Sequence, residues 1–236
     1  MRKNILITGM PRSGKSTILK EVIITHENKV GFVTNEIREN GERVGFEIET
    51  HLGTKSMLAD VKSKTNYKVS RYFVHVKNLD EIIPEVTNFS RDDILFLDEI
   101  GQMELFSEKF RQLVLRYLDS PNTCIATLSK VFADDFIEKI KNRDDIILIE
   151  INQENRGFMK KYIETLIRKI AKAKRYAAKP ERFAVNSNGM SIKTDHGIRH
   201  LKKLKEAWIC ECEFFRENQI CSHIIAAEEF LKKHNP

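Results

Sequence analysis

The sequence predicts an α/β protein with a parallel sheet that carries helices on both faces, followed by a small, ββα-like C-terminal domain. Apolar, strand-like runs alternate with stretches of helical periodicity from residue 4 to about residue 170. Repeated strand–helix units of this kind form a parallel sheet covered by helices on both sides. The run between Asp93 and Asp98 is entirely apolar, as is typical of a central parallel strand. After Pro180 the pattern changes to that of a hairpin and a helix.

The composition is that of a folded protein. The chain has 236 residues, of which 41% are hydrophobic and 31% charged, so it has room for one full domain and a small one and is not disordered throughout. We expect the domains at 1–178 and 181–236. No apolar run approaches the roughly 20 residues that span a bilayer, and the first residues lack the apolar stretch of a signal peptide. We therefore expect a cytoplasmic protein with no membrane partner.

Apolar periodicity places the elements of the first domain. Asn4–Thr8 and Val30–Thr34 are predicted as buried strands on either side of a helix at 16–26, whose apolar residues recur at helical spacing. Around residues 41–50 apolar residues alternate with glutamates between two glycines, which predicts exposed antiparallel strands. We further expect an antiparallel strand at 67–76, helices at 79–89, 107–118, 131–141 and 154–178, and strands at 93–98, 123–127 and 146–151.

Residues 9–16 read Gly-Met-Pro-Arg-Ser-Gly-Lys-Ser, which is the pattern G-x-x-x-x-G-K-S. The motif lies between a predicted strand and an amphipathic helix, the context in which backbone amides and a helix N-terminus bind phosphate. Lys15 would reach the β- and γ-phosphates, and Ser16 would offer its hydroxyl to Mg²⁺. The predicted nucleotide-binding residues of this loop are Gly9, Met10, Pro11, Arg12, Ser13, Gly14, Lys15, Ser16 and Thr17.

Two acids follow the central strand. Asp98 ends the apolar run, so its carboxylate is expected at the carboxyl edge of the sheet, where it would bind Mg²⁺ together with Ser16. Glu99 is placed to polarise a water against the γ-phosphate. The alternatives are a strand-end cap for Asp98 and a surface acid for Glu99. With Lys15, these two acids are the predicted catalytic residues.

Arginines near the predicted site have two interpretations. Arg12, Arg38, Arg43 and Arg156 are each candidates for a cis arginine finger or a substrate clamp, and each equally suits a surface salt bridge. Arg156 follows the last sheet strand and is the one expected to meet the nucleotide base. Thr127, at the end of strand 123–127, either senses the γ-phosphate or is a satisfied strand-end hydroxyl.

These segments together resemble a known family, the nucleoside-triphosphatases described from thermophiles and their cancer-related nucleoside-triphosphatase relatives. The resemblance covers about residues 1–170 and rests most specifically on the stretch Asp-Glu-Ile-Gly-Gln-Met-Glu at 98–104. It implies slow, Mg²⁺-dependent hydrolysis of ATP, GTP and other nucleoside triphosphates on a nucleotide-kinase-like fold. The segments that carry it are Gly9–Ser16, 31–38, 98–104, 124–127 and 154–156.

Four metal-ligating side chains cluster in the tail: Cys210, Cys212, Cys221 and His223. Cys210 and Cys212 would share one face of a strand at 207–213, and the other two would begin a helix at 222–233. A Cys₃His set satisfies tetrahedral Zn²⁺ and leaves no open position, so we expect a structural site. The spacing C-x-C-x8-C-x-H, with an upstream hairpin around Asn188-Gly189, resembles a SWIM zinc-binding domain, which implies DNA or protein binding.

Positive charge is concentrated in one stretch. Residues 156–182 hold ten lysines and arginines against two acids, whereas the whole chain has a net charge of +6. Such a stretch attracts polyanions, although a solvated helix face is the equal alternative. DNA or RNA, or a protein, is therefore the expected partner of residues 156–236. The candidate contacts on the stretch are Arg168, Lys169, Lys172, Lys174, Arg175 and Lys179.

Two classes of function remain. The first is a Mg²⁺-dependent nucleoside-triphosphatase, with a nucleotide or nucleoside kinase as its nearest variant. The second is a nucleic-acid-binding adaptor that uses nucleotide as a switch and hydrolyses it little. The complete set of Lys15, Ser16, Asp98 and Glu99 favours the enzyme.

Overall fold

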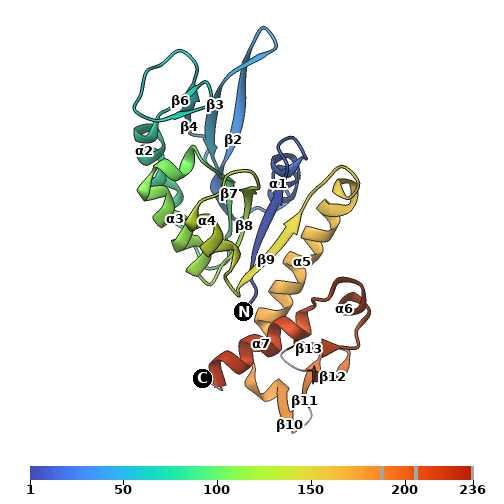
Figure 1. Cartoon of the computed structure of the whole chain (residues 1–236). Coiled ribbons are helices and arrows are strands. Elements are labelled where there is room, and N and C mark those ends of the chain that lie inside the picture. The colour runs from blue at the N-terminus through green and yellow to red at the C-terminus, as the bar shows by residue number, and fades with distance from the viewer. Residues whose placement is uncertain (187–188, 205–206, 235–236) are drawn as a thin grey trace. The chain divides into compact units, whose positions relative to one another are not determined.

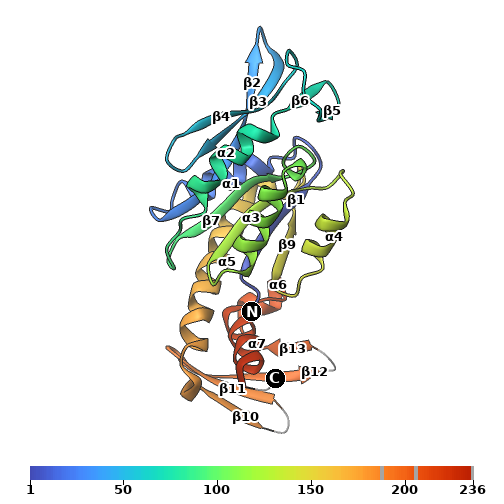
Figure 2. The same ribbon diagram turned by 90° about the vertical axis from the view of Figure 1, so that its left-hand side faces the viewer.

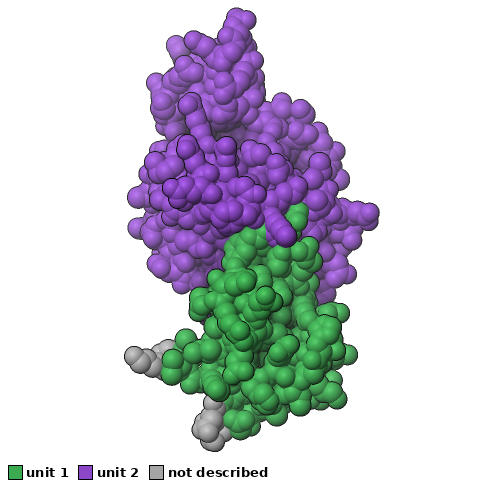
Figure 3. All heavy atoms as spheres, turned by 90° about the vertical axis from the view of Figure 1, so that its right-hand side faces the viewer, with its two compact units in different colours: residues 1–2, 162–236 green, residues 3–161 purple. Residues whose placement is uncertain are grey.

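The computed structural model describes residues 1–186, 189–204 and 207–234. The chain forms two compact units, coloured separately in Figure 3. Residues 3–161 form the N-terminal unit, and residues 1–2 together with 162–236 form the C-terminal unit. No helix of the described residues is both long and apolar enough to cross a membrane.

The N-terminal unit is built on a nine-stranded sheet of order β5-β6-β4-β3-β2-β7-β8-β1-β9 (Figure 1). Five neighbouring strands are parallel, as the repeated strand–helix pattern predicts. β8 and β1 each lie between two parallel neighbours, and both are buried along their whole length. The parallel strands are β2 (Lys29–Glu39), β7 (Ile94–Ile100), β8 (Thr123–Ser129), β1 (Asn4–Gly9) and β9 (Ile146–Glu150).

The sheet is mixed, because an antiparallel extension continues it beyond β2. The alternating stretch around residues 41–50 is β3, which pairs antiparallel with β2 and with β4. The strand expected at 67–76 is wrong as one element: a turn with Ser70 at φ 54° divides it into β5 and β6. Strand β4 has no alternating pattern that would have predicted it. The bounds are β3 (Glu42–Thr50), β4 (Lys55–Asp60), β5 (Lys68–Val69) and β6 (Tyr72–Val74).

Helices cover both faces of this sheet, as Figures 1 and 2 show. Alternate residues of a strand point to opposite faces, and Leu6 of β1 accordingly packs in one buried cluster with Phe110 and Tyr117. On the other face α1 contacts β2, β7 and β8. The helices are α1 (Lys15–Ile23), α2 (Val76–Val86), α3 (Glu108–Asp119) and α4 (Asp135–Lys141), with a 3₁₀ turn at Glu104–Phe106.

The C-terminal unit has a four-stranded antiparallel sheet of order β10-β11-β12-β13. It is larger than the expected hairpin, strand at 207–213 and helix, because the basic segment after the hairpin is itself the strand β12 and pairs on both sides. Of the expected hairpin turn, Asn188 lies outside the described residues. The elements are β10 (Phe183–Asn186), β11 (Gly189–Thr194), β12 (Gly197–Leu204), β13 (Ala207–Cys210), α6 (Glu213–Asn218) and α7 (Ser222–His234).

The division between the units differs from the boundary expected near 178–182. The contacts divide the chain after Lys161, inside the helix α5 (Arg156–Ala177). Most of α5, from Tyr162 on, belongs to the C-terminal unit, where Tyr176 stacks on His223 and its hydroxyl donates to Asp195. The amino-acid composition does not change at Lys161, because the same helix continues from one unit into the other. The sequence therefore contains no signal for a boundary there. The first two residues also join the C-terminal unit, where Arg2 pairs with Glu228 of α7.

Candidate nucleotide site and Cys/His cluster

The loop between β1 and α1 follows a path that its glycines permit. A Cβ on Gly9 would lie 2.3 Å from the carbonyl oxygen of Ile151, so only glycine fits there. Gly14, with φ 100°, is the N-cap residue just before α1, and among the described residues no side chain caps the helix. The free N-terminal turn of a helix binds anions through its amides and dipole. The local backbone is therefore that of the predicted phosphate loop.

Lys15 is held across this loop. Its Nζ donates to the Gly9 carbonyl at 3.1 Å and lies 3.9 Å from Glu99 Oε2. Its side chain is only 8% exposed, and a buried ammonium needs negative partners. Phosphate oxygens entering the loop would meet this cation together with the amides of α1.

The Asp98 carboxylate is bonded through one oxygen only. Ser16 and Thr127 both donate to Oδ1, at 2.8 Å and 2.6 Å. Within the described part of the chain the buried Oδ2 has no partner. An unpaired buried carboxylate oxygen is costly, and a hydroxyl and a carboxylate side by side are ligands that suit Mg²⁺. The residues present therefore fit the cation that the sequence predicts.

The geometry of β7 explains how two consecutive acids reach the site. The pairing of β7 with β8 shifts register between Leu97 and Ile100, and such irregularities re-aim side chains. Burial raises the pKa of Asp98 above its ordinary value, while the hydrogen bonds from Thr127 and Ser16 lower it. Burial likewise raises the pKa of Glu99, and the nearby Lys15 lowers it.

A third acid, Glu104, completes this group. Gly101 separates it from Glu99: a Cβ there would lie 3.1 Å from Glu104 Oε2 and 3.3 Å from Glu99 Oε1. Burial, followed by the charge of Glu99, raises the pKa of Glu104 to about 8. The sequence signal was its place at the end of the stretch 98–104, but no spacing rule revealed that it is buried.

These groups line a cavity of about 890 Å³ within the N-terminal unit, a size typical of ligand sites. Most of the predicted loop residues line it, and so do Asp98 and Glu99. Three predicted residues do not: Met10 is exposed, Ser13 is buried beneath the loop, and Arg156 is exposed at the start of α5. Lining residues that were not among the predicted site residues include Lys20, Thr34, Asn35, Glu104 and Lys130, of which Thr34, Asn35 and Glu104 lie in segments that carry the family resemblance.

Arg38, Arg43 and Thr127 have structural partners. Arg43 donates to the Tyr72 hydroxyl at 2.9 Å and to Glu36 at 2.7 Å, and Arg38 also pairs with Glu36. Both arginines therefore make salt bridges, and Arg43 also lines the cavity, so its role as a substrate clamp stays a prediction. Thr127 donates to Asp98, so its hydroxyl orients an acid. Arg12 lines the cavity from within the loop.

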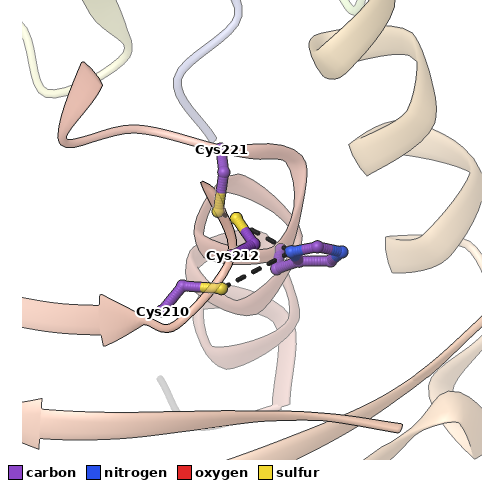
Figure 4. Close-up of side chains that lie close together, drawn as sticks. Cys210, Cys212 and Cys221 are labelled. Atoms are coloured by element: carbon purple, nitrogen blue, oxygen red, sulfur yellow. Dashed lines mark hydrogen bonds between the residues drawn. The ribbon is translucent and has the colours of Figure 1, made fainter. Parts of the chain in front are cut away.

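The Cys/His cluster lies in the C-terminal unit. Figure 4 shows the thiols of Cys210, Cys212 and Cys221 pointing toward one another. The expectation that Cys210 and Cys212 share one strand is wrong, because β13 ends at Cys210 and Cys212 precedes α6. The four side chains still converge, and their ligand atoms all lie within 4.8 Å of one another. His223 Nδ1 lies 3.5 Å from one sulfur, that of Cys210.

This geometry fits tetrahedral zinc. With a Zn–S bond of about 2.3 Å and a Zn–N bond of about 2.0 Å, tetrahedral coordination separates nitrogen from sulfur by about 3.5 Å. His223 Nδ1 lies 3.5 Å from Cys210 Sγ and 3.8 Å from Cys221 Sγ. Hydrogen bonds from Cys221 and His223 lower the pKa of Cys210, which favours the thiolate that binds metal. The donor set and the spacing therefore suit one ion.

The lysines and arginines of the basic stretch make several different kinds of contact. Lys169 Nζ lies 4.7 Å from the ring centroid of Phe214, and Lys172 lies over Tyr176. Arg168 donates to Thr165, and Arg175 is 3.6 Å from Asp195. The six candidate residues thus do not form one uniform surface.

Comparisons with known proteins assign the N-terminal part. The family model described as NTPase matches residues 4–164. A nucleoside-triphosphatase THEP1 from Thermotoga sp. (strain RQ2) is 43% identical over 155 residues, which are 65% of this chain and 88% of that protein. The human cancer-related nucleoside-triphosphatase is 31% identical, over 71% of this chain and 97% of its own.

A solved structure matches as well. The crystal structure of THEP1 from the hyperthermophile Aquifex aeolicus matches 70% of this chain and 98% of its own, with 31% identity and a TM-score of 0.64. The family match ends near the division between the two units and does not reach the Cys/His cluster, so the SWIM resemblance stays a prediction. Its coverage of the N-terminal unit is nearly complete, and the chain therefore belongs to the NTPase family of P-loop nucleoside-triphosphatases.

Proposed function

We propose that the N-terminal unit hydrolyses nucleoside 5′-triphosphates, ATP and GTP among them, to the diphosphate and phosphate. The observation that carries the proposal is Asp98 Oδ2, which has no partner among the described residues and lies on the carboxylate that the Ser16 hydroxyl contacts, at the end of the glycine-containing phosphate loop. This is the arrangement in which P-loop proteins hold a magnesium-bound triphosphate. The names of the matched relatives, nucleoside-triphosphatases, support it.

The residues of the site divide the work of binding. The loop from Gly9 to Thr17 supplies amides to the phosphates, and Lys15 supplies the positive charge between the β- and γ-phosphates. Ser16 and Asp98 would hold Mg²⁺, and Thr127 keeps Asp98 in its orientation through Oδ1. The bound ion neutralises charge that develops on the phosphate oxygens.

Glu99 is the proposed general base. Its carboxylate borders the cavity beside Lys15, so it can accept a proton from the attacking water at Oε2. Burial raises its pKa, and a base whose pKa moves toward neutrality is more effective at neutral pH. Glu104, neutral below about pH 8, adds no second charge that would repel the phosphate.

A kinase is the second candidate, because the cavity extends beyond the loop. Its far wall includes Phe46, Leu58 and Val69 of the antiparallel extension. This room next to the γ-phosphate suits a second substrate, which would make the enzyme a nucleotide or nucleoside kinase. A switch that hydrolyses little is disfavoured, since all four groups needed for hydrolysis line one cavity.

Phosphate release distinguishes these functions. The protein is incubated with ATP, GTP, CTP and UTP, with Mg²⁺ or with a chelator, and inorganic phosphate is measured. Hydrolysis predicts Mg²⁺-dependent release without a second substrate. Consumption of the triphosphate that requires an added nucleoside or nucleotide, and that phosphorylates it, identifies the kinase. Tight nucleotide binding with no release identifies the switch.

For the C-terminal unit we propose a structural zinc ion. Cys210, Cys212, Cys221 and His223 would complete its coordination and leave no position for a substrate. The ion would tie β13, α6 and the start of α7 together, which stabilises a unit with few large apolar side chains. The unit would bring the enzyme to a nucleic acid or a protein through residues 156–236.

A further inference from the structure

A second cavity, of about 680 Å³, lies within the C-terminal unit beside the Cys/His cluster. We call it the basic pocket, because two lysines and two arginines from three different elements line it. Lys169 and Lys172 come from α5, Arg199 from β12 and Arg216 from α6. The sequence pointed to the two lysines, but only the fold adds the two arginines.

The four cations of the basic pocket have no carboxylate partner within ion-pair distance among the described residues, although Lys169 and Lys172 also lie over aromatic rings. Neighbours outside the pocket are paired: Arg175 and Arg182 with Asp195, and Lys202 with Glu211. Converging cations without carboxylate partners repel one another, so a bound anion would stabilise them.

The pocket's own acids do not balance this charge. Glu211 and Glu213 line it, and Glu211 already pairs with Lys202. A zinc ion with three thiolates and a neutral histidine has a net charge of −1. One glutamate and one such cluster therefore face four cations, which leaves positive charge for a ligand.

We propose that the basic pocket binds a phosphate group, supplied by single-stranded nucleic acid or by a free nucleotide. This deepens the proposal that the C-terminal unit brings the enzyme to a nucleic acid or a protein, and it rests on that proposal. Guanidinium groups such as those of Arg199 and Arg216 bind phosphate oxygens in pairs. Phe214 lines the same pocket, and aromatic rings beside cations are the usual setting for nucleotide units.

The test compares two double variants of the full chain that each lose two positive charges. Arg199→Gln/Arg216→Gln removes cations of the pocket. Lys193→Gln/Lys203→Gln removes exposed lysines of the same sheet that do not line it. A labelled single-stranded oligonucleotide is titrated at several salt concentrations. GDP is titrated in a Lys15→Ala background, where the phosphate loop contributes little.

We expect the pocket variant to bind one of the two probes roughly tenfold more weakly or worse. If that probe is the oligonucleotide, the magnitude of the log–log salt slope should fall by about 0.7 for each phosphate that the variant no longer neutralises. The control variant should bind like the wild type. Weaker binding of GDP alone identifies a free nucleotide as the source of the phosphate, and weaker binding of the oligonucleotide identifies nucleic acid.

If binding is weakened equally in the two variants, the probes are attracted by the overall positive charge and the proposed pocket is wrong. Undetectable binding of both probes at low salt would contradict the proposal as well. Phosphate release and zinc content are measured on the same preparations. The substituted residues lie outside the cavity of the N-terminal unit. Phosphate release by the wild type therefore tests the proposed hydrolysis, and probe binding by the variants tests the basic pocket independently.

Discussion

The hydroxyl of Ser16 donates to Oδ1 of Asp98 at 2.8 Å, joining the first turn of α1 to a residue 82 positions later. Thr127 donates to the same oxygen, and within the described residues Oδ2 has no partner. Two donors on one oxygen hold the carboxylate in a single orientation. A ligand that is oriented before a cation binds has less freedom to lose.

Thr127→Val should lower the affinity of the nucleotide site for Mg²⁺. Valine keeps the shape but removes the donor to Asp98, and removal of such a supporting bond typically costs 10- to 100-fold in metal affinity. The Mg²⁺ concentration for half-maximal phosphate release should rise accordingly. Thr25→Val is the control, because that hydroxyl donates to the Val22 carbonyl of α1 and not to an acid of the site. A half-saturation equal to that of the control would remove Thr127 from the metal site.

Lys15→Ala should weaken nucleotide binding, because the variant has no charge that faces the phosphates. Titration with a fluorescent nucleoside triphosphate measures the dissociation constant. Lys29→Ala removes a lysine whose ammonium donates to a nearby carbonyl instead, and it should bind like the wild type. Unchanged affinity in Lys15→Ala would contradict the assignment of the phosphate loop.

Glu99→Gln should keep nucleotide affinity while turnover falls by roughly 10²-fold or more, the scale expected when a general base is removed. Glutamine retains the size of the side chain but accepts no proton. Glu81→Gln is the matched control, since Glu81 is exposed on α2 and pairs with Lys77. Full activity in the Glu99 variant would place the base elsewhere.

The stability of the nucleotide-free protein should fall as pH rises from about 4.5 to about 8, through Glu104. Burial raises the pKa of Glu104 to about 8 from an ordinary value of 4.5, so in this interval the folded chain keeps a proton that the unfolded chain has released. Fewer protons on the unfolded state mean that the free energy of unfolding decreases with pH, by at most about 1.4 kcal/mol per unit.

Urea unfolding followed by circular dichroism, for the wild type and Glu104→Gln at pH 5 to 8, measures this effect. Glutamine stays neutral, so the difference in unfolding free energy between the two chains should change steadily with pH. Parallel pH profiles would mean that Glu104 is ionised in the folded protein.

Metal analysis should find about one zinc per chain, and Cys221→Ser should lose it. Cys124→Ser should keep it, because Cys124 is buried in β8 and its pKa is raised by burial to about 12. A chain that ends at residue 178 should contain no zinc and still hydrolyse nucleotide. Zinc retained in Cys221→Ser would exclude this ligand set. Absence of hydrolysis in a folded shortened chain would mean that the tail serves the active site.

Local pattern accounts for the parts of the fold that follow from neighbouring residues. The order of strand, loop and helix around residues 4–23 could be predicted, because each step depends on periodicity and glycine within a few positions. The division of 67–76 into β5 and β6 could not, because both pieces are too short for a period to appear. Strand β4 exists through its pairing with β3 and not through its own sequence.

The sequence by itself determined which chemical groups are available: a phosphate loop, two acids after a buried strand, and three thiols with an imidazole. Only the tertiary structure decided how they are used. It placed Thr127 on Asp98, buried Glu104 beside Glu99, left Arg156 outside the cavity, and joined Arg2 to Glu228. The reason is physical, since burial and distance set a side chain's partners and its pKa, and both arise between residues that are far apart in the chain.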